Sequence, residues 1–238
     1  LASGGKTNAN HQKIRQSSLK VVFELIRFVK HKVSTLAFFL PGIVSAIVKL
    51  LHSSKNEWID DLAIEQCLYC LSEIVCCVLS WDAQHREDWI QGKEVNLPSL
   101  NVTASPFTIK YSKEWFDDTV SKVTSVLNST IPIFANHAHA TVRKACAAFS
   151  ATVLEHCKET LPESQRILLE TLLSLSNDSW ELVSAFAKGE IDHLKEKNLI
   201  PLEMIKVILK ADLGFDSTTS KSYSSFFYQE NEIRVLAT

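Results

Sequence analysis

Six cysteines carry the most distinctive chemistry in this sequence. Cys67 and Cys70 form a C-x-x-C dyad, a spacing that zinc sites and redox pairs use, and Cys76-Cys77 follow it. A zinc site would need a second dyad or a histidine cluster at ligand spacing, and none follows. All six cysteines also fall inside helical patterns, along their apolar rows. With no secretory signal, we expect free core thiols in a reducing compartment, the cytoplasm and also the nucleus.

His137-Ala138-His139 is the second candidate for metal binding. It falls at a turn between two predicted helices and has no acidic or thiol partner nearby in the sequence, so we expect an exposed or capping role. The acidic pairs Asp60-Asp61 and Asp117-Asp118 each stand near a helix start, where negative charge complements the helix macrodipole. None of these residues requires a catalytic interpretation.

The sequence motifs of common catalytic sites are absent. There is no G-x-S-x-G, no G-x-x-x-x-G-K and no H-E-x-x-H. The sequence therefore predicts no catalytic residue, no cofactor and no metal, and we expect a protein that is not an enzyme. Lys and Arg are scattered among acids at a formal net charge of −2, which argues against nucleic-acid binding. The longest uncharged run, sixteen residues between Lys32 and Lys49, is too short to predict a membrane span.

The elements that position these residues form a repeated two-helix pattern. Residues 112–130 and 139–157 each show an apolar stripe at steps of three and four, and residues 162–176 and 179–194 form a second such pair. Val142-Arg143 superposes on Val183-Ser184, a shift of 183 − 142 = 41 residues. That period lies within the roughly 40–47 residues of HEAT-type units. We predict an all-α helical-repeat solenoid with Phe149 and Phe186 in its core.

The rest of the chain divides around this pattern. Gln12–Lys30 is an amphipathic helix, and a helix that starts at Pro41 and ends at His52 is apolar nearly all round, so we expect other helices to sandwich it. A long helix over Glu57–Trp81 follows. The predicted organisation is a flexible segment (1–12), N-terminal repeats (13–81), an irregular insertion loop (82–110), C-terminal repeats (111–212) and a tail (213–238).

Aromatic residues outside the stripes are the candidate partner anchors, because interface hot spots are enriched in Trp and Tyr. They are Trp89 in the insertion loop and Phe226, Phe227 and Tyr228 in the tail. The tail aromatics could equally cap the last helix. A separate expectation is that Arg143 pairs with Asp178 across adjacent repeats and orients them.

Phe38-Phe39-Leu40-Pro41-Gly42 and Thr141-Val142-Arg143-Lys144, in an ordered series of segments between Thr35 and Lys188, resemble the Tel-two-interacting HEAT-repeat scaffold family of the triple-T co-chaperone complex. Ser184 departs from the usual basic residue of the HEAT pattern. The resemblance implies a non-enzymatic scaffold that works with two partner subunits and the heat-shock chaperone machinery. It would support maturation, stability and assembly of phosphatidylinositol-3-kinase-related kinases.

Two other classes remain open from the sequence. A karyopherin-like transport solenoid would bind cargo or a small GTPase through its inner helices, and acidic inner helices would favour it, whereas the second helices here carry mixed charge. A helical lipid- or metal-binding enzyme domain is the third alternative.

Overall fold

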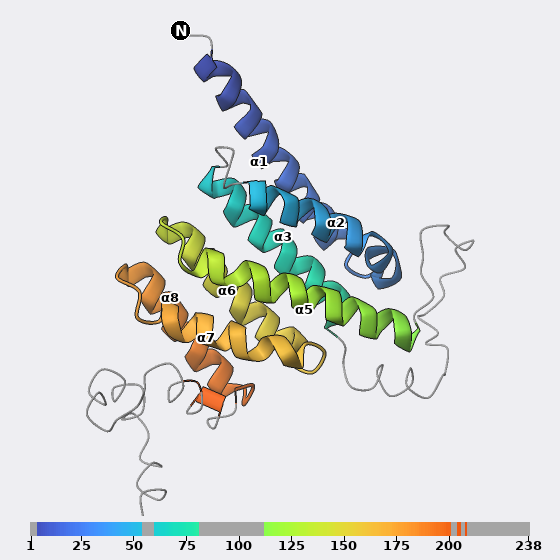
Figure 1. The fold of residues 1–238 in the computed structure, drawn as a ribbon, viewed down its shortest axis with the longest axis vertical. Coiled ribbons are helices and arrows are strands. Elements are labelled where there is room, and N and C mark those ends of the chain that lie inside the picture. Colours follow the sequence, from blue (N-terminus) through green and yellow to red (C-terminus); the bar gives the residue numbers. More distant parts are fainter. Residues whose placement is uncertain (1–3, 54–59, 81–111, 201–203, 206–207, 209–238) are drawn as a thin grey trace, which may run out of the picture. The chain divides into compact units, whose positions relative to one another are not determined.

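The computed structural model describes residues 4–53, 60–80, 112–200, 204–205 and 208, with side chains from residue 11 onward except Ser34. By its internal contacts the chain divides into a unit of Leu1–Leu199 and a unit of Ile200–Thr238. In the second unit, residues 204, 205 and 208 are helical. The described part of the chain contains helices and no strand (Figure 1), which confirms the predicted all-α solenoid class.

Seven α-helices and one short 3-10 turn make up the described part of the first unit. They are α1 (Gly4–Val29), α2 (Val33–Ser53), α3 (Asp61–Leu79), α5 (Lys113–Ala135), α6 (Ala140–Cys157), the 3-10 turn η1 (Pro162–Ser164), α7 (Gln165–Leu175) and α8 (Glu181–Glu196).

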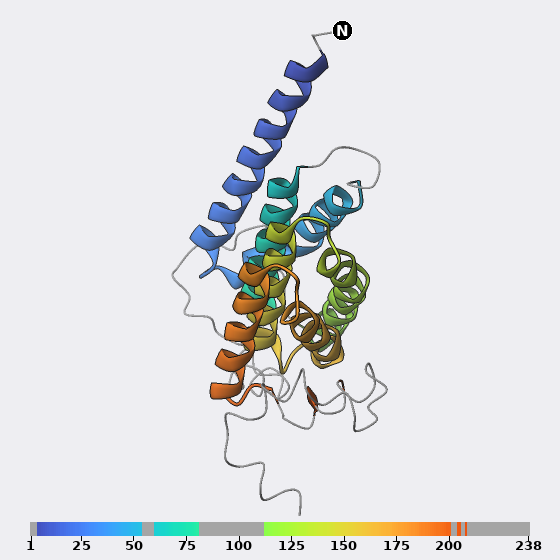
Figure 2. The same cartoon turned by 90° about the vertical axis from the view of Figure 1, so that its left-hand side faces the viewer.

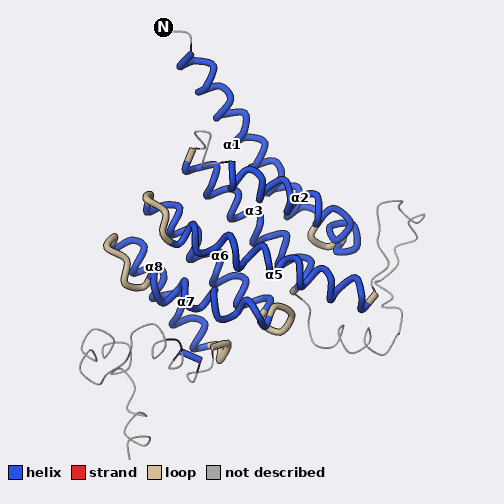
Figure 3. The backbone as a smooth tube through the Cα atoms, in the orientation of Figure 1, coloured by secondary structure: helices blue, strands red, loops and turns tan. Residues whose placement is uncertain are grey.

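The helices of this unit form two layers. Helices α1, α3, α6 and α8 pack side by side in one layer, and α2, α5 and α7 lie in the other (Figure 2). Each of the pairs α2–α3, α5–α6 and α7–α8 crosses from one layer to the other. The turns ahead of α6 and α8 lie along the same edge as the start of α3 (Figure 3). The apolar stripes therefore meet between the layers, as in other stacked helix pairs.

Helix α6 is the central helix of this core, because it packs against α3, α5, α7 and α8. Its predicted stripe is buried throughout, and Phe149 is fully buried. Val183 and Ala187 of α8 are buried like Val142 and Cys146 of α6, so the shift of 41 residues relates equivalent core positions. The stripe of α6 comprises Val142, Cys146, Phe149, Val153 and Cys157.

The prediction that Phe186 packs fully inside is wrong, because its side chain is only half-buried. The buried stripe of α8 is Val183, Ala187, Ile191 and Leu194, and Phe186 lies on the flank of that stripe. The Lys144 Nζ lies 5.2 Å from the centroid of the Phe186 ring, a cation–π contact between α6 and α8.

Three helix starts differ from the sequence prediction. Helix α3 begins at Asp61 rather than Glu57, because Asp60 is its extended N-cap residue. Helix α1 begins at Gly4 rather than Gln12, because residues 4–11 contain no proline and each added residue gains one backbone hydrogen bond. Helix α2 begins at Val33 and runs through Pro41, where we expected a turn. A proline inside a helix costs about 3 kcal/mol. Burial of Leu36 and Leu40, at about 1.5–3 kcal/mol each, offsets that cost.

Helix α2 is also less enclosed than its composition predicts. It packs on α3, but its contacts with α1 are few, and few residues join it to α5. Phe38 and Phe39 are exposed, with ring centroids 5.1 Å apart in an edge-to-face arrangement. The expectation that other helices sandwich α2 is therefore wrong for the described helices, and apolar surface remains uncovered on its flanks.

By length and composition alone, α2 and α3 are long and apolar enough to cross a membrane, over Thr35–His52 and Asp61–Leu79. Most of α3 is buried as a core helix of this unit, whereas one third of the α2 stretch is buried. Buried core helices commonly meet the same criterion. These two helices are therefore weak indicators of a membrane span.

Candidate protein-binding surface

A groove of about 390 Å³ lies between α2 and α5. Its lining is mainly apolar, and Lys49, Asp118 and Lys122 stand among the lining residues. The Lys122 Nζ lies 2.6 Å from Asp118 Oδ2, an exposed pair whose contribution to stability is small. The apolar lining comprises Leu40, Val44 and Val48 of α2 with Trp115, Val123 and Val126 of α5.

A second groove, of about 510 Å³, lies on the other flank of α2, against α1. Its lining is again mainly apolar, with His11, Arg15 and Ser18 as polar residues. The apolar lining comprises Ile14, Leu19 and Val22 of α1 with Ile43, Ile47 and Leu50 of α2.

Helix α2 forms one wall of each groove, so the two grooves are the candidate binding surface of this unit. Apolar grooves between helices are the usual binding sites for amphipathic helices, which place residues i, i+3, i+4 and i+7 into the groove. Apolar side chains form most of both linings, so the surface is suited to binding by burial of apolar area. Neither lining contains a cysteine, and the α1–α2 groove contains His11 as its one histidine.

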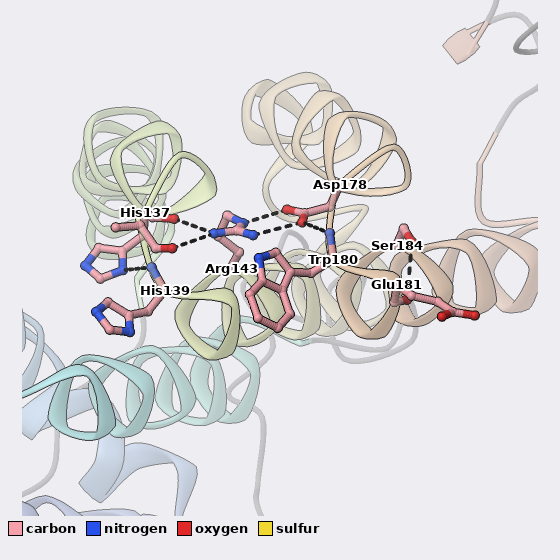
Figure 4. A network of polar contacts seen from close by, with 8 residues as sticks. His137, His139, Arg143, Asp178, Trp180, Glu181 and Ser184 are labelled. Carbon is pink, nitrogen blue, oxygen red and sulfur yellow. Dashed lines mark hydrogen bonds and ion pairs between the residues drawn. The ribbon is translucent and has the colours of Figure 1, made fainter.

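The predicted Arg143–Asp178 pair is present and links adjacent repeats (Figure 4). Arg143 Nε donates to Asp178 Oδ2 at 2.5 Å, and Nη2 donates to Oδ1 at 2.8 Å. Arg143 Nη1 also donates to the carbonyl oxygens of His137 and Ala138, at 2.8 and 3.0 Å. The backbone N–H of Trp180 donates to Asp178 Oδ1 at 2.8 Å. The guanidinium therefore joins the α5–α6 turn to the α7–α8 turn.

This pair is buried, not exposed, because only 11% of the Arg143 side chain and 7% of the Asp178 side chain reach solvent. The hydrogen bond from Arg143 lowers the pKa of Asp178 below its ordinary value and raises the pKa of Arg143. Ser184 occupies the equivalent position of α8, and its hydroxyl donates to the Glu181 carbonyl at 3.2 Å (Figure 4). Ser184 therefore does not form an equivalent of the Arg143–Asp178 pair.

The histidines of the α5–α6 turn contact the start of α3. His139 Nδ1 lies 3.0 Å from Asp61 Oδ2, and His137 Nε2 lies 4.0 Å from Asp61 Oδ1. Burial lowers the pKa of His137. Asp60 caps α3 by accepting from the Leu62 N–H at 3.3 Å, as expected for an acidic pair at a helix start. Among the residues that the structure describes, no three metal-ligating side chains come together.

The cysteines are free, and all but the half-buried Cys77 are buried, as the sequence predicts. Burial raises the pKa of the Cys67 thiol to about 12 and that of Cys70 to about 11. Thiolates are the metal-binding and nucleophilic form, so these residues are poorly suited to either role. The Cys157 and Cys76 sulfurs lie 3.9 Å apart between α6 and α3 and fill the core there.

We expect the thiols of the folded chain to react slowly with an alkylating reagent at pH 8, because burial keeps them protonated and inaccessible. Counting modified cysteines by mass spectrometry tests this. All six should react quickly once the chain is unfolded in denaturant. Rapid modification of Cys67 or Cys70 in the folded chain would contradict the assignment of these residues to the core.

The predicted aromatic anchors Trp89, Phe226, Phe227 and Tyr228 lie outside the described residues, as do the insertion loop over 82–110 and the tail over 213–238. Most of residues 201–212, the end of the predicted C-terminal repeats, lies outside them too. The candidate binding surface in the described residues is instead the pair of grooves beside α2, which the sequence did not predict. The sequence signal for these grooves is the near-continuous apolar run from Thr35 to Leu51, which by itself predicts core packing.

The described architecture, with antiparallel helix pairs stacked in two layers and Arg143 joining their turns, defines a helical-repeat protein of the kind that binds other proteins. A comparison with protein-family models agrees, because the model described as the TTI1 N-terminal TPR domain matches residues 5–179. The chain belongs to this family, which is not a known enzyme family. No curated protein and no solved structure matches the chain significantly.

Proposed function

We propose that the chain is a non-enzymatic protein-binding scaffold of the triple-T co-chaperone complex. In this role it supports maturation, stability and assembly of phosphatidylinositol-3-kinase-related kinases, together with the heat-shock chaperone machinery. Membership of the TTI1 family supports this proposal. We also propose that the protein acts in the cytoplasm and the nucleus, without a cofactor and without binding nucleic acid or membrane.

The observation that carries the protein-binding role is the uncovered apolar surface of α2. A helix with apolar residues nearly all round is stable in water only where neighbours cover it. Helix α2 is covered by α3 and bordered by open apolar grooves on both flanks. Covering these grooves would remove apolar surface from water, at roughly 25 cal/mol per Å² of buried area. Partner helices are therefore the natural occupants.

Co-purification from cell extract tests the identity of the partners. The chain carrying an affinity tag should recover the other subunits of the co-chaperone complex, kinases of the phosphatidylinositol-3-kinase-related class and heat-shock chaperones, identified by mass spectrometry. Recovery of import cargo or a small GTPase in their place would contradict the proposal and support a transport solenoid.

A further inference from the structure

Two buried thiols face each other across the contact between α3 and α6. The Cys157 thiol donates to the Cys76 sulfur, with the two sulfurs 3.9 Å apart, and the Cys76 thiol lies 3.7 Å from the Thr152 carbonyl oxygen. Bonded sulfurs in a disulfide are about 2.05 Å apart, so this pair must close by about 1.9 Å. A change of rotamer about the Cα–Cβ bonds is large enough to supply that movement.

The other cysteines are placed differently, and the side chains of all six lie in the described part of the chain. The thiols of Cys70 and Cys146 lie 3.4 and 3.7 Å from backbone carbonyl oxygens. Cys77 follows Cys76 directly on α3, and adjacent residues of a helix point about 100° apart, so these two cannot join without disrupting the helix. Cys76 and Cys157 are therefore the pair best placed to form a disulfide.

The position of this pair gives a disulfide a clear structural effect. Helix α3 also packs against α1 and α2, whereas α6 also packs against α5, α7 and α8. Along the chain, 81 residues separate the two cysteines. A bond between them would join the two groups of helices covalently, and it would restrict the unfolded chain as well.

The surroundings of the pair keep it reduced under mild conditions. Hydrogen bonding with Cys157 and burial raise the pKa of the Cys76 thiol well above its ordinary value. The thiolate is the reactive form, so a buried, protonated pair reacts slowly with oxidants. Cys76 is nevertheless 8% exposed, against 1% for Cys157, so a small neutral oxidant reaches Cys76 first.

We propose that Cys76 and Cys157 form a reversible disulfide in response to hydrogen peroxide, which locks α3 to α6. Peroxide first converts the Cys76 thiol to a sulfenic acid, and one water is released. The Cys157 sulfur then attacks the Cys76 sulfur, so that the S–S bond forms, the S–O bond breaks and the hydroxyl leaves with the Cys157 proton as a second water. Two thiols are oxidised by two electrons, and one peroxide is reduced to two waters. Thiol reductants reverse the bond by exchange.

Peptide mapping of the 238-residue chain tests this proposal. The folded chain is incubated with hydrogen peroxide, the remaining thiols are blocked in denaturant, and the protein is cleaved after glutamate. Cleavage at Glu73 and Glu155 separates Cys76 from Cys70 and Cys157 from Cys146. We expect mass spectrometry to find the Cys76 and Cys157 peptides joined, two hydrogen atoms lighter than the free peptides, and separated again by dithiothreitol. The oxidised chain should melt about 5 °C or more above the reduced chain.

Matched variants assign the bond to this pair. Cys76→Ala and Cys157→Ala should each abolish the joined peptides and the rise in melting temperature. Cys146→Ala is the control, because Cys146 is also buried on α6 but lies against a backbone carbonyl, and it should retain both effects. Cys77→Ala should retain them too, which distinguishes Cys76 from its neighbour. Thermal melts of the reduced variants show whether each one folds.

The absence of joined peptides in the oxidised wild-type chain would overturn the proposal, whether or not the variants fold. Joined peptides that survive in Cys76→Ala but not in Cys77→Ala would assign the chemistry to Cys77 and overturn it as well, as would a bond between Cys67 and Cys70. An equal rise in melting temperature in Cys157→Ala would exclude the lock between α3 and α6. None of these results depends on partner recovery, so the proposed function is tested separately.

Discussion

Replacing Phe149 with Ala is expected to lower the free energy of unfolding by about 3–5 kcal/mol. The side chain is fully buried in α6, which packs against α3, α5, α7 and α8, so the cavity would open at the centre of the unit. Neighbouring repeats stabilise one another in a solenoid, and the loss should therefore spread beyond α6. Chemical denaturation measures it as a shift of the midpoint.

Phe186→Ala is the matched comparison. Its side chain is half-buried and contacts Lys144, so we expect a smaller loss, about 1–2 kcal/mol. Losses of equal size in the two variants, or a loss below about 1 kcal/mol for Phe149→Ala, would show that the core is placed wrongly.

Arg143→Ala is expected to destabilise the fold by about 3–5 kcal/mol, because it leaves the carboxylate of a buried pair without its partner. The Asp178 side chain is only 7% exposed, and Arg143 also holds the two carbonyl oxygens of the α5–α6 turn. Urea denaturation measures the loss. The double variant Arg143→Met with Asp178→Leu removes both charges and should lose less than Arg143→Ala, since no buried charge remains unpaired. A double variant that loses more would contradict this explanation.

The same pair makes stability depend on pH. The pKa of Asp178 is lowered in the folded chain from its ordinary value of 3.8, chiefly by the hydrogen bond from Arg143. The pair therefore contributes its full stability above that ordinary value and loses it as the pH falls through the folded pKa. The stability difference between the wild type and Arg143→Ala should be constant near neutral pH and shrink in acid. An unchanged difference down to about pH 2 would exclude this linkage.

The repeated apolar stripes were predictable because residues buried along one face of a helix recur in the sequence at steps of three and four. Val142 and Val183 occupy equivalent buried positions, and Arg143 pairs with Asp178 as the repeat pattern predicted. Pro41 was not predictable in the same way, because local rules disfavour proline inside a helix while the burial of Leu36 and Leu40 favours it. Which effect prevails depends on tertiary contacts that the sequence does not display.

The candidate binding surface beside α2 was not predicted from the sequence, for a related reason. An apolar run predicts that a helix will be covered, but it does not distinguish cover by the chain itself from cover by a partner. Val48 and Val126 carry the same hydrophobic signal as core residues, although they line the α2–α5 groove.

The most direct test of the account is whether partner recovery depends on the α2–α5 groove. Co-purification from extract should be compared between the wild type and the variants Val48→Glu and Val126→Glu, with Leu182→Glu on α8 as the control. A thermal melt of each protein confirms folding. The account predicts that the folded groove variants lose the co-chaperone subunits while Leu182→Glu retains them. Full recovery by folded Val48→Glu and Val126→Glu would contradict the claim that this surface binds partners.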